Sequence, residues 1–289
     1  MSSSKSSLKN KDKISAFLIV HNEEKVIERA LKSISGVVDE IIIIHDGICK
    51  DDTLKISKKY TRKIFIRPHK GRASLHMIFA FKKSKNDWLL KLDADEYLSK
   101  DLRENIQKLA QNKKAFAYMF KWLLWDGKQY VTKNWPKKKA LFRKSGISFL
   151  QFPGWDEPNT NGLVISTNYI LEHKPKEGKN DLFWKWKDYW EKSTKEGGRG
   201  TTQAEYTLKP FSSFEKFQYS GKDFPLAMRI RRKFPLISSP LFAVLAFFKI
   251  AFSGGAWKEG IYSFKGGLET AIHYLWLGWY INKLKNKKI

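Results

Sequence analysis

The sequence predicts an α/β fold, built on a mostly parallel sheet and followed by a helical C-terminal segment. Up to Leu98, short apolar runs rich in β-branched residues alternate with stretches whose apolar residues recur at helical spacing. This alternation is typical of right-handed strand–helix–strand units. From Phe224 onward the chain becomes apolar, aromatic and basic, with almost no acidic residues. We therefore predict a lead-in at 1–13, an α/β domain at 14–223 and a helical segment at 224–289.

Strands and helices alternate in the predicted α/β domain. The strands are predicted at 14–20, 40–44, 63–66 and 88–92, and the helices at 24–34, 52–60 and 73–83. The first two strands read ISAFLIV and EIIII, which are nearly continuous apolar runs, as expected for strands covered on both faces. Ligands of such sheets bind beyond the carboxyl ends of the strands. The residues that follow each apolar run are therefore the candidates for a site.

Composition and charge exclude several classes of protein. With 42% hydrophobic and 15% aromatic residues, the chain can bury a core, which excludes wholesale disorder. The single cysteine, Cys49, excludes an internal disulfide framework and a multi-cysteine zinc site, and it indicates a cytoplasmic setting. The lead-in is rich in Ser and Lys without the apolar stretch of a signal peptide, so we expect it to be disordered. The net charge of +26 predicts attraction to nucleic acid, anionic lipid or phosphorylated substrates.

Polar clusters follow three of the predicted strands. HNEE follows the first strand from position 21, HDG lies at 45–47 after the second, and DADE follows the fourth from position 93. Because the carboxyl ends of parallel strands meet at one edge of a sheet, these clusters are expected to converge on one crevice. The alternative is that they are ordinary turn and cap residues.

Asp93 and Asp95 are the most informative pair in these clusters. In an extended segment residues i and i+2 point to the same side, so both carboxylates are expected to face the crevice while Leu92 and Ala94 pack inward. Paired hard oxygen ligands suit Mg²⁺ or Mn²⁺. Asp46, followed by a glycine, is expected to accept a hydrogen bond from a base or ribose edge.

The runs ISAFLIVHNEE, DEIIIIHDGICKDDT and DWLLKLDADEYL resemble the nucleotide-sugar-binding half of family 2 glycosyltransferases, which have the GT-A fold. The resemblance covers residues 14–98. It implies a Rossmann-like domain in which Asp46 reads the base while Asp93 and Asp95 hold the donor diphosphate through Mg²⁺ or Mn²⁺. The nucleotide-sugar contacts that it implies are Val20, His21, Glu23, Asp46, Asp93 and Ala94.

The sequence departs from the family pattern at two places. The usual DDGS after the second strand is HDGI at 45–48, and the usual Ala-Arg-Asn before the fourth strand is absent. The identity of the base therefore stays open. We expect Lys70 or Arg72 to supply a cation that faces the phosphates.

The acceptor side is expected between residues 115 and 174. An inverting transfer needs a general base for the acceptor hydroxyl, and Asp156 and Glu157 are the adjacent acidic pair of that stretch. A solvated turn is the alternative. The chain is also similar to lipopolysaccharide-core and lipid-linked glucosyltransferases, a resemblance that favours Glu157 as the base. The same resemblance makes His173 a candidate metal or diphosphate contact, against a purely structural histidine.

The C-terminal segment predicts a location at a membrane surface. Uncharged stretches at 234–248 and 270–282 fall short of the roughly 20 residues that span a bilayer, so neither is expected to be a conventional transmembrane helix. The segment 224–289 carries 11 cations against 2 acidic residues, with Trp257, Trp276, Trp279 and Tyr280 as interfacial anchors. We expect peripheral or monotopic attachment to anionic lipid on the cytoplasmic face. The alternative is that these helices complete a core or form a dimer interface.

Together these features predict a metal-dependent inverting glycosyltransferase that uses a nucleotide-diphosphate sugar and a glycan or glycolipid acceptor. A polyprenyl-phosphate sugar synthase is the narrower alternative. A non-catalytic basic protein that binds nucleic acid or anionic membrane is the alternative of another class, and the aromatic and lysine residues of 183–190 would suit it as a stacking platform. We prefer an amphipathic helix there and expect no nucleic-acid partner, because a binding module has no need of clustered carboxylates.

Overall fold

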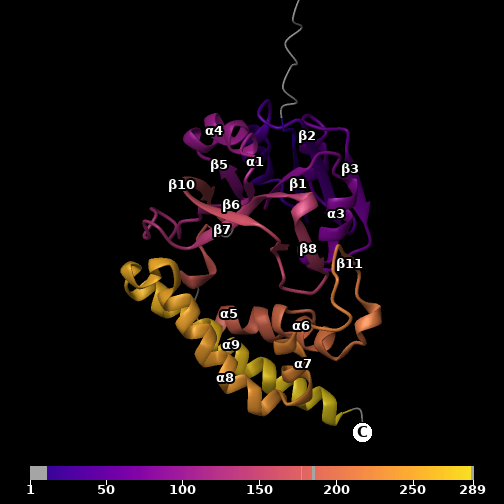
Figure 1. The fold of residues 1–289 in the computed structure, drawn as a ribbon, viewed down its shortest axis with the longest axis vertical. Coiled ribbons are helices and arrows are strands. Elements are labelled where there is room, and N and C mark those ends of the chain that lie inside the picture. The colour runs from indigo at the N-terminus through magenta and orange to yellow at the C-terminus, as the bar shows by residue number, and fades with distance from the viewer. Residues whose placement is uncertain (1–11, 177, 184–185, 288–289) are drawn as a thin grey trace, which may run out of the picture.

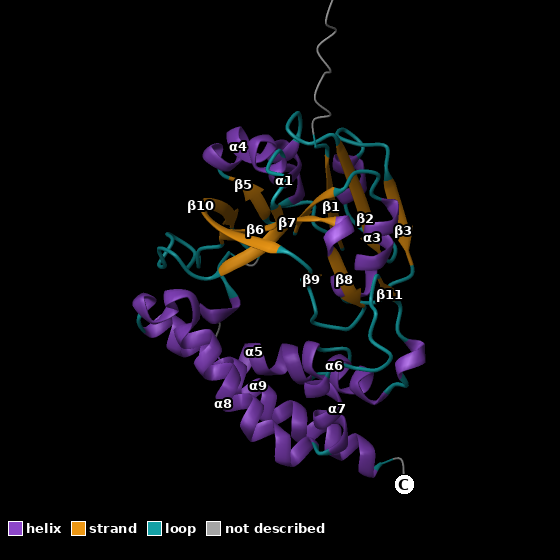
Figure 2. Cartoon of the chain, viewed as in Figure 1, coloured by secondary structure: helices purple, strands orange, loops and turns teal. Residues whose placement is uncertain are grey.

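The protein consists of an α/β domain and a layer of C-terminal helices beneath it (Figure 1). The computed structural model describes residues 12–176, 178–183 and 186–287. The lead-in at 1–13 was predicted to be disordered, and all of it except residues 12 and 13 lies outside the described residues. Figure 2 shows that the strands are confined to the α/β domain, whereas the lower layer is helical.

An eight-stranded sheet forms the centre of the α/β domain. Its order is β3 (Ile64–Arg67), β2 (Glu40–Asp46), β1 (Ile14–Val20), β4 (Trp88–Leu92), β7 (Lys137–Arg143), β6 (Ala115–Lys121), β10 (Leu163–His173) and β5 (Glu96–Leu98). The strands β3, β2, β1 and β4 are parallel, and β10 runs parallel to β6. Antiparallel pairing is limited to β7, between β4 and β6, and to β5 on β10. The predicted mostly parallel α/β sheet is confirmed.

Helices cover both faces of the sheet, which explains the continuous apolar strands. Alternate residues of β1 point to opposite faces. Ile14 and Leu18 pack with α1 (Ile27–Ile34) and α4 (Lys100–Ala110), with α2 (Thr53–Ser57) at the edge. Phe17 packs on the other face with α3 (Met77–Lys83), and η1 (Ala73–His76) lies against β1 and β2.

A second, three-stranded sheet borders the segment that carries Asp156 and Glu157. It has the order β11 (Lys216–Phe217), β8 (Ile147–Leu150) and β9 (Asn159–Thr160), so the loop at 151–158 connects two of its strands. The short helices η2 (Lys144–Gly146), η3 (Asp181–Phe183) and η4 (Phe211–Ser213) complete the connections.

The lower layer contains α5 (Trp186–Thr194), α6 (Arg199–Leu208), α7 (Leu226–Lys233), α8 (Pro235–Phe252), η5 (Ser253–Glu259) and α9 (Ile261–Asn286). The helices α8 and α9 form an antiparallel hairpin. A Cβ at Gly278 would lie 1.8 Å from the Ser239 hydroxyl oxygen, and one at Gly267 would lie 3.0 Å from the Phe247 carbonyl, so glycines allow the two helices to approach closely. Leu277 on α9 packs against Ala204, so α6, which precedes the predicted boundary at 223/224, belongs to the same layer.

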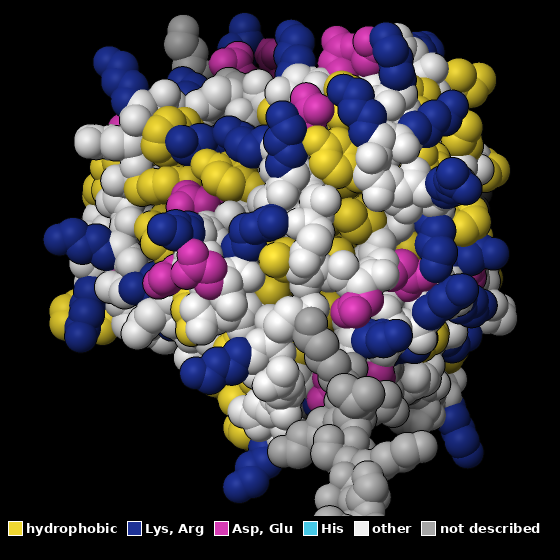
Figure 3. Space-filling view, turned by 90° about the horizontal axis from the view of Figure 1, so that it is seen from above, with side chains coloured by type: hydrophobic (Ala, Val, Ile, Leu, Met, Phe, Trp, Pro, Cys, Tyr) yellow, Lys and Arg dark blue, Asp and Glu magenta, His cyan; other side chains and the backbone are white. Residues whose placement is uncertain are grey.

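The helices of the hairpin are longer than the uncharged stretches suggested. Among the described residues, Pro235–Glu259 is long and apolar enough to cross a membrane by length and composition. This segment is longer than the uncharged stretch at 234–248 because it continues past Lys249, and the expectation that it is not a conventional transmembrane helix stays a prediction. Lys and Arg side chains are also spread over the face of the α/β domain seen from above, among acidic ones, so positive charge is not confined to the hairpin (Figure 3).

Candidate functional site

A pocket of about 630 Å³ opens at the carboxyl ends of β1, β2 and β3. Ile48 and Ile66 are 78% and 61% exposed, so they offer apolar walls on which a flat ring could pack. The pocket is lined by His21, Asn22, Gly47, Ile48, Lys50, Ile66, Arg67, Pro68 and His69.

The Asp46 carboxylate accepts hydrogen bonds from other residues of the chain. The side chain is almost fully buried and accepts hydrogen bonds from the backbone N–H groups of Lys70 (2.6 Å) and Gly71 (2.8 Å) and from His76 Nε2 (2.8 Å). Burial raises the pKa of Asp46, but these hydrogen bonds and the nearby histidines outweigh it and lower that pKa overall. The carboxylate therefore orders the loop at 69–72, and its expected contact with a base or ribose stays a prediction.

Two histidine side chains form hydrogen bonds with the backbone carbonyl of Asp46. The Nδ1 atoms of His21 and His69 lie 2.5 and 3.2 Å from the Asp46 carbonyl oxygen. A carbonyl oxygen only accepts, so each Nδ1 carries a proton. The expected nucleoside contact His21 thus lines the pocket together with His69, which the sequence did not single out because nothing in its local pattern links it to Asp46.

The other expected nucleoside contacts lie differently. Val20 is buried, so only its main chain is available to a ligand. The Glu23 carboxylate lies 3.4 Å from Lys176 Nζ, and its backbone N–H donates to Thr53 Oγ1. Lys176 follows β10 and also donates to the Asn22 carbonyl, so it links the segment after β1 to the segment after β10.

The DxD segment is a turn. The Glu96 N–H donates to the Asp93 carbonyl at 3.1 Å, so the extended conformation expected for 93–95 is wrong, because the chain turns from β4 into β5. The two aspartates consequently have different partners. Asp93 contacts Lys138 Nζ at 2.5 Å and Lys91 Nζ at 3.8 Å, whereas Asp95 faces β10.

Lys138, from β7, lies between two carboxylates. Its Nζ is 2.5 Å from Asp93 Oδ2 and 2.5 Å from Glu96 Oε1, and Glu96 is fully buried and also accepts from Trp122 Nε1 at 2.6 Å. Burial opposes the charge on Lys138, but the two carboxylates outweigh it and raise its pKa. Burial, with help from Asp93, raises the pKa of Glu96, whereas Lys138 and Lys91 overcome burial and lower the pKa of Asp93. The sequence placed Glu96 in the polar cluster after the fourth strand without giving it a role, and it did not single out Lys138.

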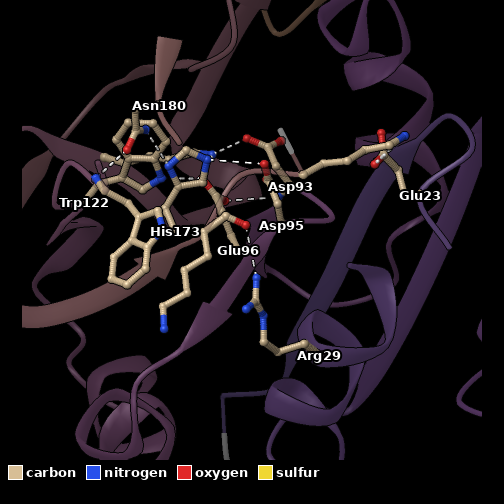
Figure 4. Close-up of polar contacts among 12 residues, drawn as sticks. Glu23, Arg29, Asp93, Asp95, Glu96, Trp122, His173 and Asn180 are labelled. Carbon is tan, nitrogen blue, oxygen red and sulfur yellow. Dashed lines mark hydrogen bonds and ion pairs between the residues drawn. The ribbon is translucent and has the colours of Figure 1, made fainter. Parts of the chain in front are cut away.

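His173 and Asp95 form the second pair of the turn (Figure 4). His173 Nε2 lies 3.3 Å from Asp95 Oδ2, although the two residues belong to different segments. The Trp122 ring stacks on the imidazole at 3.9 Å, and the Asn180 amide contacts Nδ1 at 2.9 Å while its oxygen accepts the Trp125 N–H. The structure thus brings together two of the three expected metal contacts, Asp95 and His173, and holds the imidazole in one orientation.

The loop with the acidic pair rests on the sheet. Glu157 is exposed, and its Oε1 accepts the backbone N–H of Lys139 at 3.1 Å, one residue beyond Lys138 on β7. Asp156 is also exposed, and its charge acts on Arg72. Burial and the nearby Arg199 lower the pKa of Arg72, and the Asp156 carboxylate partly offsets this lowering. Arg72 donates to the Gly197 carbonyl at 3.1 Å, on the side of the C-terminal helices. Lys70 contributes its backbone N–H to Asp46.

Comparison with known proteins identifies the family. The family described as "Glycosyl transferase family 2" matches residues 15–164, which run from β1 to the start of β10. The chain belongs to glycosyl transferase family 2. Together with the parallel order of β3, β2, β1 and β4, this membership confirms the predicted GT-A fold.

Several relatives are similar over part of their length. The chain is 35% identical over 144 residues to an uncharacterized glycosyltransferase of Rickettsia felis, covering 48% of this chain and 50% of the relative. It is 29% identical over 174 residues to the SPbeta prophage-derived glycosyltransferase SunS of Bacillus subtilis, covering 56% of this chain and 38% of that protein. The chain thus matches about half the length of the rickettsial relatives.

Solved structures resemble it more distantly. The crystal structure of S. aureus TarS is 15% identical, with a TM-score of 0.44 and coverage of 89% of this chain and 55% of that one. Glucosyl-3-phosphoglycerate synthase from Mycobacterium tuberculosis, in complex with Mn²⁺ and UDP-glucose, is 17% identical, with a TM-score of 0.41 and coverage of 57% and 72%.

Proposed function

We propose that this chain transfers a sugar, with inversion, from a nucleoside-diphosphate donor to a hydroxyl of a glycan or glycolipid at a membrane surface, with the help of Mg²⁺ or Mn²⁺. The observation that carries the proposal is the Asp95–His173 pair at 3.3 Å, beside the Asp93–Lys138 contact and at the same strand ends as the 630 Å³ pocket. A carboxylate, an imidazole and a pocket with apolar walls are what a metal-bound nucleoside diphosphate requires.

The chain's donors fit a divalent cation that is completed by substrate. Asp95 Oδ2 and His173 Nε2 face each other, and Asn180 and Trp122 hold the orientation of the imidazole. Because the Asn180 amide nitrogen donates to Nδ1, Nε2 carries the proton towards Asp95 here and would have to give it up before it could hold a metal. Among the described residues no group of three or more His, Cys, Asp or Glu could hold a metal alone. In Mg²⁺-type sites, waters and substrate phosphates would fill the remaining positions. When bound, the metal would neutralise the charge that develops on the departing diphosphate.

The chain's own residues bind the donor and move the proton. The pocket holds the nucleoside, with His21 and His69 at its polar edge and Ile48 and Ile66 against its ring. Lys138 keeps Asp93 ionised and fixed at the turn. Glu157 accepts the acceptor hydroxyl proton as that oxygen bonds to the anomeric carbon. The bond from this carbon to the diphosphate oxygen breaks, and the nucleoside diphosphate leaves from the opposite face with the electron pair.

Glu157 is preferred over Asp156 as the base for a geometric reason. Its anchor, the Lys139 N–H, is adjacent on β7 to the lysine that contacts Asp93, so the loop is tethered close to the donor side. One carboxylate oxygen is used by this anchor, which orients the second oxygen without neutralising it. Asp156 instead lies near Arg72, which favours a role in orienting that guanidinium.

The hairpin supports attachment parallel to the membrane plane. Exposed apolar residues recur along α8 (Leu236, Ile237, Leu241, Val244, Leu245, Phe248 and Phe252) and along α9 (Phe264, Leu268, Leu275 and Trp279). Both ends of the hairpin are tied to the rest of the chain: Glu259 accepts the Lys133 and Asn134 N–H groups, and α9 packs on α6. A helix held at both ends against the enzyme favours lying in the interface over crossing the bilayer.

One observation keeps the polyprenyl-phosphate alternative in view. A groove of about 400 Å³ between α8 and α9 is lined entirely by apolar residues, and it has the chemistry of a site for a hydrocarbon chain. A lipid-phosphate acceptor gives a product whose sugar is cleaved by mild acid, whereas a glycosidic product resists it.

The test is nucleotide binding with and without metal. We expect one of UDP, GDP, CDP and dTDP to bind with a clear gain in the presence of Mn²⁺, measured by titration calorimetry. Asp95→Asn and His173→Ala should remove the gain, whereas Asp126→Asn, a half-buried aspartate in the loop after β6, should keep it. Metal-dependent binding that survives in the Asp95→Asn, His173→Ala double variant would show that the site is assigned wrongly.

A further inference from the structure

A second pocket, of about 580 Å³, lies at the base of the α8–α9 hairpin, where α8 begins and α9 ends. We call it the basic pocket. Four cations and one carboxylate line it, on an apolar floor. Its residues are Leu208, Phe211, Asp223, Phe224, Arg229, Arg232, Lys233 and Lys285.

Two of the cations are part of the framework. Arg232 Nη1 donates to the Thr207 and Lys209 carbonyls at the end of α6, and Lys285 Nζ donates to the Arg232 and Lys233 carbonyls, at 3.4 and 3.2 Å, at the end of α7. These bonds fix the two charges at the junction of three helices. Arg229 and Lys233 are set differently: Arg229 is about half exposed and lies 3.7 Å from Asp223, and Lys233 is exposed beside the Phe234 ring.

The exposed apolar residues next to the basic pocket indicate which anion it would bind. Lys233 is followed directly by Phe234, Leu236 and Ile237, which are 48%, 53% and 79% exposed and begin the apolar surface of α8. A helix lying in a membrane interface has its cations at the depth of the lipid phosphates and its apolar face in the acyl region. The basic pocket therefore sits at the boundary between these two levels.

We propose that the basic pocket binds the phosphate of an anionic phospholipid headgroup and so fixes the depth and rotation of the hairpin on the membrane. The inference rests on the membrane attachment in the proposed function. Guanidinium and ammonium groups converging from α7 and α9 would hold the phosphate oxygens by charge-assisted hydrogen bonds. The Phe211–Phe224 pair, with ring centroids 5.0 Å apart, would support the glycerol side.

The experiment separates a built pocket from diffuse attraction. Full-length protein is sedimented with phosphatidylcholine vesicles made anionic either by phosphatidylglycerol or, at equal zeta potential, by oleate. The pocket variant is Arg229→Gln with Lys233→Gln. The matched control is Lys283→Gln with Lys287→Gln, two exposed lysines at the same end of the hairpin that do not line the pocket. Each lost cation weakens diffuse attraction about fivefold, so that effect is equal in both variants.

We expect the pocket variant to lose about tenfold more affinity than the control on phosphatidylglycerol vesicles, and no more than the control on oleate vesicles. If the pocket variant loses no more affinity than the control on either kind of vesicle, the proposed phosphate site is wrong, whereas the membrane attachment is still supported. Wild-type protein that binds neither kind would overturn the attachment itself. Calorimetric binding of glycerol 3-phosphate that is lost in the pocket variant, with vesicle binding equal to the control, would assign the pocket to a soluble phosphate and overturn the lipid proposal.

Discussion

Replacing Lys138 with Met should destabilise the α/β domain through Glu96. In the wild type, Lys138 lies 2.5 Å from the carboxylate of Glu96, whose side chain is 0% exposed, and 2.5 Å from that of Asp93, which is 41% exposed. Asp93 can turn to water, whereas Glu96 cannot. Removing one partner of a buried ion pair costs about 3–5 kcal/mol, a large share of the 5–15 kcal/mol that is typical of a domain.

The assay is urea unfolding of purified protein, followed by circular dichroism. Lys137→Met is the control, because its ammonium contacts Ser166 at the surface, and it should change the free energy of unfolding by less than about 0.5 kcal/mol. Adding Glu96→Gln to Lys138→Met should recover about 2 kcal/mol. The recovery is incomplete because Glu96 accepts N–H groups from both Trp122 and Asp93, and an amide has one acceptor atom. A Lys138→Met loss no larger than that of the control, or no recovery in the double variant, would refute this reasoning.

Three further outcomes are expected. Glu157→Gln should lower kcat by about 10²–10⁴-fold with nucleotide binding unchanged, and Asp156→Asn should cost less; the reverse ranking, from steady-state kinetics, would move the base. Asn180→Ala should weaken metal-dependent nucleotide binding about 10–100-fold in calorimetry, while binding without metal stays the same. Burial, with Arg199 and Arg231 nearby, lowers the pKa of His273 to about 4 in the folded protein. As the pH falls, His273 is therefore protonated in the unfolded chain before it is protonated in the folded one, and the free energy of unfolding should decrease between about pH 6.5 and pH 4. His273→Gln should remove on the order of 2 kcal/mol of that pH dependence in urea unfolding, and an unchanged pH profile would speak against the shift.

The front half of the fold was predictable because its strands are buried on both faces. The runs at 14–20 and 88–92 coincide with β1 and β4, since apolar residues dominate both runs and their polar members, Ser15 and Lys91, are also buried. Helix ends were less accurate. The helix expected from residue 24 begins at Ile27, because the N–H groups of Val26 and Ile27 both turn back to the Glu23 carbonyl. A local turn of this kind leaves no mark in the apolar spacing.

The sequence predicted where the candidate site residues lie better than it predicted which partners their side chains contact. The sequence placed Asp46 and Asp95 at the correct strand ends, but the direction of a carboxylate depends on partners far along the chain. His76 determines it for Asp46 and His173 for Asp95. Lys138 was missed for a related reason: a lysine in the basic run KKKALFR has the composition of a solvated strand, and its burial follows from acidic residues on another segment.

The position of Lys138 and Lys139 as consecutive residues of β7 limits how this region can vary in length. Lys138 reaches the carboxylates of the DxD turn with its side chain, while Lys139 holds Glu157 with its main chain. Side chains alternate along a strand, so an insertion or deletion that shifts β7 by one residue turns the ammonium to the opposite face and moves the anchor of Glu157 at the same time. Natural length variation between 121 and 137 should therefore be absorbed in the connecting loop, away from the strand register.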